Sequence, residues 1–439
     1  MLIKFKFKNF RSFFSESLLS LEASKKQDLE YSVLDYNGKR ILPIAVIYGG
    51  NASGKTTIIL ANLVLKSLIL SGNITPYNND SNLKNIGISS YLYNKDKYEV
   101  PIELGITFTE NINDEKVLIE YNISLKNNFE NMENTEIVYE SLHINNELLF
   151  KKNKKEIIFG QGKKVSKYYL DYIDNNSVEK ALNVYSELYK LNNDTKSVFT
   201  SWYKPYNSRL VDIITKWFKE KYFVMYNFNE SQMDYVLNKN IDYKDISIIE
   251  DRRFDLLKNI IEIGKQKIVL NKDENSNKLN VKSVYKIENG NKYKELLINS
   301  DITESTGTLK MYKFLEPFIN VLSNGGVMII DELDASIHPE LMLGIIKVFR
   351  DKTINANNAQ LIFNTHNPIF LNGNVFRRDE IYFVEKNKED YTSELYSLND
   401  FINVRNDKSY LKDYLNGVYG ALPDCDMTNV IKNILKRRG

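Results

Sequence analysis

The chain has 439 residues, of which 43% are hydrophobic, and its formal net charge is +2. The single cysteine, Cys425, excludes an intrachain disulfide and a cysteine-based zinc site, and three histidines leave little for a histidine-rich metal site. Because basic and acidic residues nearly balance, the chain as a whole has no strong positive electrostatic field that would attract nucleic acid or an anionic membrane. No apolar run approaches the ~18 residues of a membrane helix, so we expect a soluble, cytoplasmic protein without a membrane partner.

The first part of the chain predicts strands followed by one helix. Residues 3–8 alternate apolar side chains with lysines, which is the period of a strand. A buried apolar run closes this part at Ile41–Tyr48. Residues 55–71 have helical spacing and are apolar nearly all round, so we expect that helix to be covered on both sides. Strand-like runs follow at residues 101–109, 117–125, 136–142 and 147–150.

A glycine-rich turn lies between the apolar run and the helix, and it fits the phosphate-loop pattern G-x-x-x-x-G-K-[ST]. Backbone N–H groups at a helix start bind phosphates well. Lys55 would reach the β and γ oxygens of ATP, and Thr56 would ligate Mg²⁺. A chance match of a glycine-rich turn is the weaker alternative. The candidate nucleotide-binding residues here are Gly49, Gly50, Asn51, Ala52, Ser53, Gly54, Lys55, Thr56 and Thr57.

The hydrophobic pattern changes in the later part of the chain and then predicts alternating helices and strands. Residues 178–265 carry helical spacing, and strand-like runs at 281–287 and 295–298 follow. From residue 304 the order is helix, strand, helix and strand, which predicts a parallel sheet with helices on its faces. We therefore expect an α/β nucleotide-binding domain in two pieces. The predicted division is 1–150, a mostly helical insertion at 151–280, and 281–439.

Polar residues follow two of these predicted strands. Asp331 and Glu332 come directly after an apolar strand, where Asp331 would hold Mg²⁺ and Glu332 would act as general base. A solvated acidic turn is the alternative, which the phosphate loop makes less favourable. His366 follows the next strand, and strand ends of a parallel sheet converge on the ligand. A lone histidine is more often structural than catalytic, but this position favours contact with the γ-phosphate. His338, before Pro339, is expected to cap or pack.

The order of these motifs resembles the ABC-type ATPase heads of the SMC and RecF kind. In that family a serine–glycine signature contacts the γ-phosphate held by the opposite subunit, and Ser305 and Gly307 match it. Asp334 matches the D-loop aspartate, and His366 matches the switch histidine. Arg11 and Ser12 lie in a segment, Lys8-Asn9-Phe10-Arg11-Ser12-Phe13, that is similar to the one near the nucleotide in such heads. The resemblance implies ATP and Mg²⁺ as cofactors and a homodimer or higher oligomer with shared ATP sites.

Finer features resemble the AAA family ATPases of the AbiL and RloA type, from bacterial abortive infection. These include the block DELDASIHP at 331–339 and the tail from Tyr414 to Pro423. The resemblance implies an antiviral defence role beside a separately encoded effector, often a nuclease, with a nucleic acid or a phage protein as trigger. Asp424 and Asp426 are a poor metal site, and the stretch after His366 is too short for a toprim nuclease domain. We therefore expect the toxic chemistry in a partner.

Three other functions remain open at this point. A RecF-like repair ATPase would bind DNA when ATP is bound. A transporter subunit is disfavoured by the long insertion and the opening segment, and a self-sufficient toxin would arrest growth alone. Two basic stretches are best explained as solvated faces, with binding to phosphate backbones or to a partner as the alternative. They are Lys151, Lys152, Lys154, Lys155, Lys163, Lys164 and Lys167, and Lys432, Lys436, Arg437 and Arg438.

Overall fold

The computed structural model describes most of the chain, and two compact units make it up. The large unit comprises Leu2–Thr215 and Asn364–Gly439, and the small unit comprises Lys216–Phe363 with Met1. The described residues are 1–72, 88–112, 115–127, 135–153, 156–160, 197–199, 208–226, 248–249, 257–260, 267–272, 279–289, 292–402, 404, 409–423 and 427–436.

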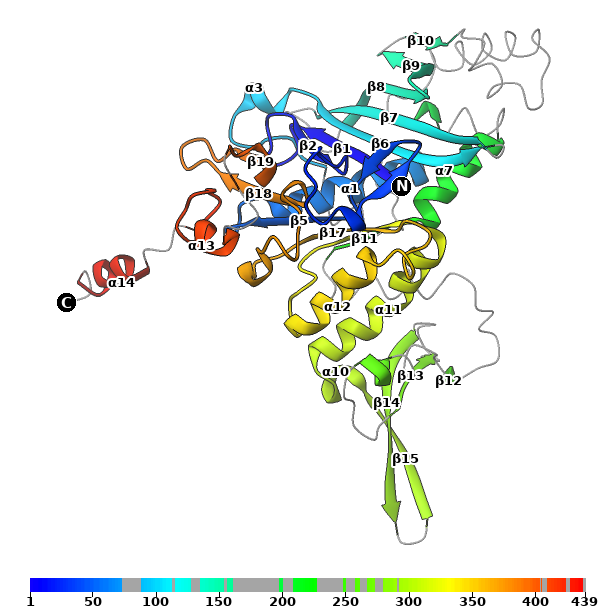
Figure 1. Ribbon diagram of the computed structural model, residues 1–439, viewed down its shortest axis with the longest axis vertical. Coiled ribbons are helices and arrows are strands. Elements are labelled where there is room, and N and C mark those ends of the chain that lie inside the picture. The colour runs from blue at the N-terminus through cyan, green and yellow to red at the C-terminus, as the bar shows by residue number, and fades with distance from the viewer. Residues whose placement is uncertain are drawn as a thin grey trace. The chain divides into compact units, whose positions relative to one another are not determined.

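The large unit contains a seven-stranded antiparallel sheet in the order β10-β9-β8-β7-β6-β1-β2 (Figure 1). Its strands alternate in the way the sequence predicts: in β1 the Phe5 and Phe7 side chains are buried, whereas the lysines between them are partly exposed. The bounds are β1 Leu2–Lys8, β2 Ser17–Ser20, β6 Ile102–Ile112, β7 Glu115–Asn127, β8 Thr135–Ile144, β9 Glu147–Asn153 and β10 Glu156–Phe159.

A second group of strands in the large unit leads to the phosphate loop. β5 (Ile44–Gly49) pairs in parallel with β18 (Ile381–Lys386), and β18 pairs antiparallel with β19 (Ser393–Ser397). All six residues of β5 are buried. Helix α1 (Lys55–Ser71) follows the loop and buries residues on nearly every side, as its apolar composition predicts.

Short elements complete the large unit. They are η1 Glu30–Ser32, β3 Leu34–Tyr36, β4 Lys39–Ile41, α3 Lys95–Tyr98, η3 Pro368–Phe370, η4 Arg378–Glu380, η5 Leu398–Asp400, α13 Tyr410–Leu415 and α14 Met427–Lys436. Helix α7 (Ser208–Glu220) contains the boundary between the two units. Among the described residues, no helix is both long and apolar enough to cross a membrane.

The small unit combines a parallel and an antiparallel sheet. β11 (Tyr222–Met225), β16 (Val327–Ile330) and β17 (Gln360–Asn364) pair in parallel. The antiparallel sheet ends in a long hairpin, β14 with β15, that Figure 1 shows clearly. Its strands are β12 Ile248–Ile249, β13 Lys267–Lys272, β14 Leu279–Asn289 and β15 Lys292–Asn299, and the helices are α10 Ser300–Thr303, α11 Thr306–Asn324 and α12 Pro339–Arg350.

The mixed α/β class is confirmed, and so are most of the predicted elements that fall on described residues. The helix at 55–71 has the predicted bounds, and α11, β16, α12 and β17 follow the predicted order of helix, strand, helix and strand. The segment predicted as helical at 178–265 contains α7, but it also contains β11, whose pairing with β16 decides its structure. Much of 151–280 lies outside the described residues, so the predicted domain division stays a prediction.

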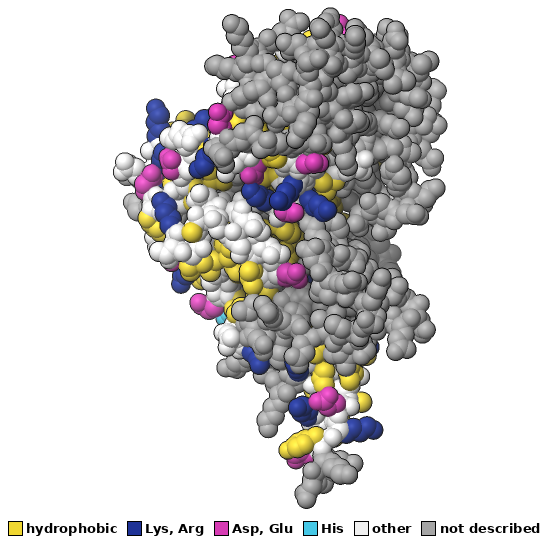
Figure 2. Space-filling view, turned by 90° about the vertical axis from the view of Figure 1, so that its right-hand side faces the viewer, with side chains coloured by type: hydrophobic (Ala, Val, Ile, Leu, Met, Phe, Trp, Pro, Cys, Tyr) yellow, Lys and Arg dark blue, Asp and Glu magenta, His cyan; other side chains and the backbone are white. Residues whose placement is uncertain are grey.

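Charged side chains of both signs are mixed on the described part of the surface. On the face in Figure 2, lysines and arginines lie among aspartates and glutamates, without a large area of one sign. This distribution agrees with the formal net charge of +2. Exposed ion pairs such as Lys286–Glu295 in the β14–β15 hairpin contribute little to stability.

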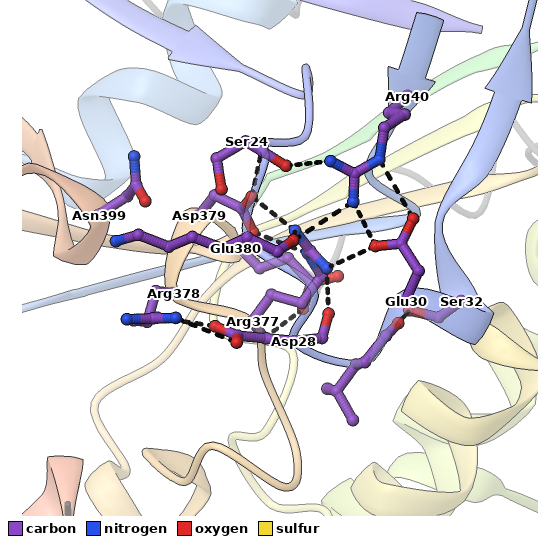
Figure 3. A network of polar contacts seen from close by, with 12 residues as sticks. Ser24, Asp28, Glu30, Ser32, Arg40, Arg377, Arg378, Asp379, Glu380 and Asn399 are labelled. Atoms are coloured by element: carbon purple, nitrogen blue, oxygen red, sulfur yellow. Dashed lines mark hydrogen bonds and ion pairs between the residues drawn. The ribbon is translucent and has the colours of Figure 1, made fainter. Parts of the chain in front are cut away.

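A buried arginine ties the segment before β3 to η4 (Figure 3). The Arg377 side chain is fully buried, and its Nε and Nη2 atoms donate to the Asp379 carboxylate, each at 2.9 Å. The same guanidinium donates to the backbone carbonyls of Lys26 and Asp28. Burial disfavours the charged guanidinium and by itself lowers the pKa of Arg377. The hydrogen bonds and the ion pair with Asp379 outweigh this effect and raise the pKa. Arg377 therefore joins two segments far apart in sequence.

We predict that Arg377→Met destabilises the protein by about 3–5 kcal/mol, because it leaves the buried Asp379 carboxylate without its cation. Arg377→Lys should also be destabilising, since an ammonium cannot replace the bidentate fork. Chemical denaturation measures the change. The exposed Lys286→Met serves as control and should cost at most about 1 kcal/mol. Equal stability of the Arg377→Met protein and the control would contradict this account of the network.

Candidate functional site

The phosphate loop joins β5 to α1 in the large unit. Gly54 is the N-cap of α1 with φ +119°, a conformation that favours glycine. Thr57 N donates to Gly54 O at 2.9 Å, and Ser53 N donates to Gly50 O at 3.3 Å. Asn51 and Ala52 are exposed at the tip, and Thr56 is partly exposed at the helix start. The loop thus presents a helix N-terminus, which is the arrangement that binds phosphate.

Lys55 lies inside this loop with its charge held by the backbone. Its side chain is only 4% exposed. The Nζ atom donates to Gly49 O at 2.9 Å and to Gly50 O at 2.8 Å. Two carbonyls of the loop therefore hold the ammonium beside the start of α1.

Glycines in the loop permit contacts that a side chain would prevent. A β-carbon on Gly49 would lie 2.5 Å from the carbonyl oxygen of Val384 in β18. A β-carbon on Gly54 would lie 2.9 Å from the Phe13 ring and 3.1 Å from Ser12 Oγ. Ser12 and Phe13 of the opening segment therefore pack against the phosphate loop.

Ser393, at the start of β19, connects the loop to that opening segment. Its Oγ atom donates to Ser53 O at 2.5 Å and lies at hydrogen-bond distance, 2.9 Å, from Ser12 Oγ, and its backbone N donates to Ser12 O at 2.7 Å. Ser393 was not predicted, because no local pattern marks a serine that acts across such a separation. Ser53 Oγ is buried and without a hydrogen-bond partner among the described residues, as expected of a hydroxyl suited to a ligand.

Arg11 and His366 belong to the large unit as well. Arg11 has a positive φ of 53°, and its backbone N donates to Ser89 O at 2.9 Å. His366 is exposed in the turn that follows β17. The residue before it, Thr365, is buried and donates from its backbone N to Ile47 O of β5 at 3.1 Å. His366 thus follows a residue that is bonded to the strand leading into the loop.

The acidic residues lie in a turn after β16 in the small unit. Asp331 N donates to Met225 O of β11 at 2.9 Å. Glu332 follows with φ +49°, a left-handed conformation that is costly for a side chain of this kind and is found often at functional sites. Glu332 is exposed, and Asp331 and Asp334 are partly exposed. The turn therefore presents its carboxylates to the surface of the unit.

Lys310 of α11 holds this acidic turn in shape. Its side chain is 7% exposed, and Nζ donates to the backbone carbonyls of Glu332 and Ala335. Burial lowers the pKa of Lys310, and the nearby carboxylates of Asp334, Glu332 and Asp331 oppose that shift. Lys310 was not predicted, because α11 contains a second lysine, Lys313, and no local pattern sets Lys310 apart from it.

The predicted signature residues begin α11 and touch the same turn. Ser305 is the N-cap of α11, and its Oγ accepts a hydrogen bond from Thr308 N at 3.1 Å. Ser305 is exposed. A β-carbon on Gly307 would lie less than 3.0 Å from the carbonyl oxygen of Ser336. Only glycine allows the helix start to approach the turn this closely, so signature and acidic turn form one cluster.

The candidate residues therefore form two groups, one in each unit. The large unit contains the loop, Arg11, Ser12 and His366, of which Ser12 contacts the loop, and the small unit contains Ser305, Gly307, Asp331, Glu332 and Asp334. Their chemical roles stay predictions. His338 caps α12, because its Nδ1 accepts from Glu340 N at 3.2 Å, which confirms its expected structural role. Asp424 and Asp426 lie outside the described residues, as do Lys154, Lys155, Lys163, Lys164, Lys167, Arg437 and Arg438.

The residues present fit ATP with Mg²⁺. Mg²⁺ takes one or two protein oxygens together with phosphate and water oxygens, and the Thr56 hydroxyl at the start of α1 is a ligand of that kind. In the described part of the chain, no group of three or more His, Cys, Asp or Glu side chains could hold a metal ion. A nucleotide-dependent Mg²⁺ site is consistent with this composition.

We predict that Lys310→Met lowers the free energy of unfolding by about 1–3 kcal/mol, because two backbone carbonyls lose their donor. Lys347→Met, on the exposed side of α12, is the control and should have little effect. Because the folded pKa of Lys310 is lowered, its side chain binds more protons in the unfolded state, and the contribution of Lys310 to stability rises with pH between that pKa and the ordinary value of about 10.4. Lys310→Met should remove this pH-dependent contribution. Chemical denaturation at several pH values measures it, and the same pH dependence of stability in variant and wild type would contradict the prediction.

Comparison with known proteins places the chain in a family. Residues 44–372, more than half of the chain, match the family model described as "AAA domain, putative AbiEii toxin, Type IV TA system". This range includes the phosphate loop, the signature, the acidic turn and His366. No curated protein matches the chain significantly. The chain therefore belongs to this AAA-domain ATPase family, which is associated with toxin–antitoxin systems of the abortive-infection type.

Proposed function

We propose that the chain binds and hydrolyses ATP and uses ATP-dependent self-association to control a separately encoded toxic effector in anti-phage defence. The observation that carries the catalytic part is the Lys55 ammonium, which the Gly49 and Gly50 carbonyls hold at the start of α1. The toxin–antitoxin association of the family supports the partner. A nuclease is the proposed effector, and a nucleic acid or a phage protein is the proposed trigger.

Each candidate residue has a role in this proposal. The N–H groups of the phosphate loop bind the phosphates, and Lys55 stabilises the charge that develops on the transferred group. Glu332 accepts a proton from the attacking water, whose oxygen bonds to the γ-phosphorus as ADP leaves. His366 contacts the γ-phosphate, and Thr56 and Asp331 ligate Mg²⁺. When bound, Mg²⁺ neutralises charge on the β and γ oxygens.

The signature residues suggest how two copies would share a site. Ser305 is exposed at the N-terminus of the 19-residue helix α11, whose positive end favours an anion. We propose that Ser305, Gly307 and Asp334 of one copy complete the ATP site at Lys55 of another. The Gly307 contact with Ser336 supports this arrangement, because it fixes the helix start to the turn that carries Asp334.

We predict that Lys55→Ala reduces ATP turnover by at least about 10²-fold, because it removes the cation that stabilises the transition state. The phage protection should be lost together with the turnover. Lys66→Ala is a matched control: Lys66 is also a buried lysine of α1, about 16 Å along the helix axis from Lys55. Equal turnover of wild type and Lys55→Ala at saturating Mg-ATP would exclude the assigned site.

The shared site gives a second prediction. Glu332→Gln keeps the side-chain shape but removes the base, so ATP should remain bound and the ATP-bound assembly should accumulate in sedimentation experiments. Adding Ser305→Arg should block this ATP-dependent association while leaving ATP binding to the single copy intact. Ser323→Arg, at the other end of α11, is the control and should still associate.

Mixing two inactive proteins tests the same mechanism by activity. In a mixture of Ser305→Arg and Lys55→Ala, one of the two sites keeps both Lys55 and Ser305, so part of the hydrolysis should return. A verified monomer whose specific activity does not depend on protein concentration down to nanomolar values would contradict the shared site.

A further inference from the structure

The segment Gly417–Pro423, which we call the tail segment, is anchored in the large unit by two buried residues, whereas its other residues, Pro423 included, are exposed or partly exposed. Tyr419 is 1% exposed and Ala421 is 2% exposed. Two tyrosine hydroxyls donate to backbone carbonyls of the tail segment: Tyr396 Oη to Tyr419 O at 2.7 Å, and Tyr414 Oη to Ala421 O at 3.1 Å. These contacts hold its backbone at two points.

Aromatic rings connect the tail segment to the strand beside β5. The Phe383 ring of β18 stacks on Tyr414 and on Tyr419, each with ring centroids 5.6 Å apart. Ala421 has a positive φ of 55°, which costs about 1 kcal/mol or more in a residue other than glycine. The packing around Ala421 must therefore impose this conformation. This conformation sets the direction in which the backbone continues to Pro423, the last residue of the tail segment.

Pro423 lies directly against the phosphate loop. A β-carbon on Gly50 would be 3.2 Å from both Cα and N of Pro423. Gly50 is also one of the two residues whose carbonyl binds Lys55, at 2.8 Å from Nζ. Because a phosphate-loop lysine reaches the β and γ oxygens, Pro423 supports the part of the loop at the γ-phosphate end. Neither residue needs a side-chain functional group for this contact.

We propose that Pro423 is a positioning residue of the nucleotide site, which sets the Gly50 carbonyl and through it the Lys55 ammonium. The inference rests on the proposed binding of ATP at this loop. The tail segment then supports the phosphate loop at the end that faces the γ-phosphate. It should favour a nucleoside triphosphate over a diphosphate, because only the triphosphate uses this end of the loop fully.

Direct binding to the full chain tests this role without relying on turnover. We expect Pro423→Gly, which loosens the backbone beside Gly50, to weaken binding of a non-hydrolysable ATP analogue by about tenfold. Binding of ADP should weaken by less than about threefold. Leu422→Ala changes the neighbouring, partly exposed residue and is the control, with both affinities retained. Thermal unfolding of the three proteins should coincide, which separates positioning from a loss of fold.

A double variant makes the test independent of any one substitution. Gly50→Ala places a β-carbon against Cα and N of Pro423 and should weaken binding of the ATP analogue. Pro423→Gly keeps both atoms but frees the backbone at residue 423 to shift, so in the same chain it should relieve part of that loss. Independent effects of the two changes, or equal losses for ATP analogue and ADP, would overturn the inference while leaving ATP binding at the loop intact. Failure of the wild type to bind either nucleotide would instead reject the proposed function.

Discussion

Backbone contacts too close for a β-carbon hold both groups of candidate residues in place. At Gly49, Gly54 and Gly307 an added β-carbon would come within 3.0 Å of another atom of the chain. These contacts join the phosphate loop to β18 and to Phe13, and the start of α11 to the turn after Asp331. A substitution at Gly49 or Gly307 would displace backbone atoms, and one at Gly54 would displace the side chains of Phe13, Ser12 and Ser393. The geometry of the chemical groups therefore depends on residues that carry no chemistry themselves.

A buried lysine completes each group by binding two backbone carbonyls. Lys55 binds Gly49 and Gly50, and Lys310 binds Glu332 and Ala335. Burying an ammonium costs desolvation energy, and hydrogen bonds to carbonyl dipoles offset part of that cost. The lysines differ in what they support. In the proposed mechanism the charge of Lys55 serves the ligand, whereas Lys310 stabilises a turn in which Glu332 has an unfavourable backbone conformation.

The sequence predicted elements with strong local signals and missed contacts over long separations. Helix α1 was predictable because a glycine–lysine–threonine start precedes a continuous helical pattern, and α12 because His338 and Pro339 mark its beginning. Strand β11 was not, because its pairing with β16 decides its structure. Ser393 was not, because its hydrogen bond reaches Ser53, 340 residues away in sequence. The candidate motifs could thus be predicted, but not the residues that hold them.

Segments distant in sequence support the phosphate loop at both ends. Ser12 and Ser393 lie at its later part, next to Gly54, and Pro423 lies at its earlier part, next to Gly50. Between them the Lys55 ammonium is fixed by two carbonyls. A loop held in this way loses little conformational freedom when a phosphate binds, and preorganised donors cost no rearrangement as charge develops. The same rigidity means that changes in packing far from the loop in sequence reach Lys55 through backbone atoms.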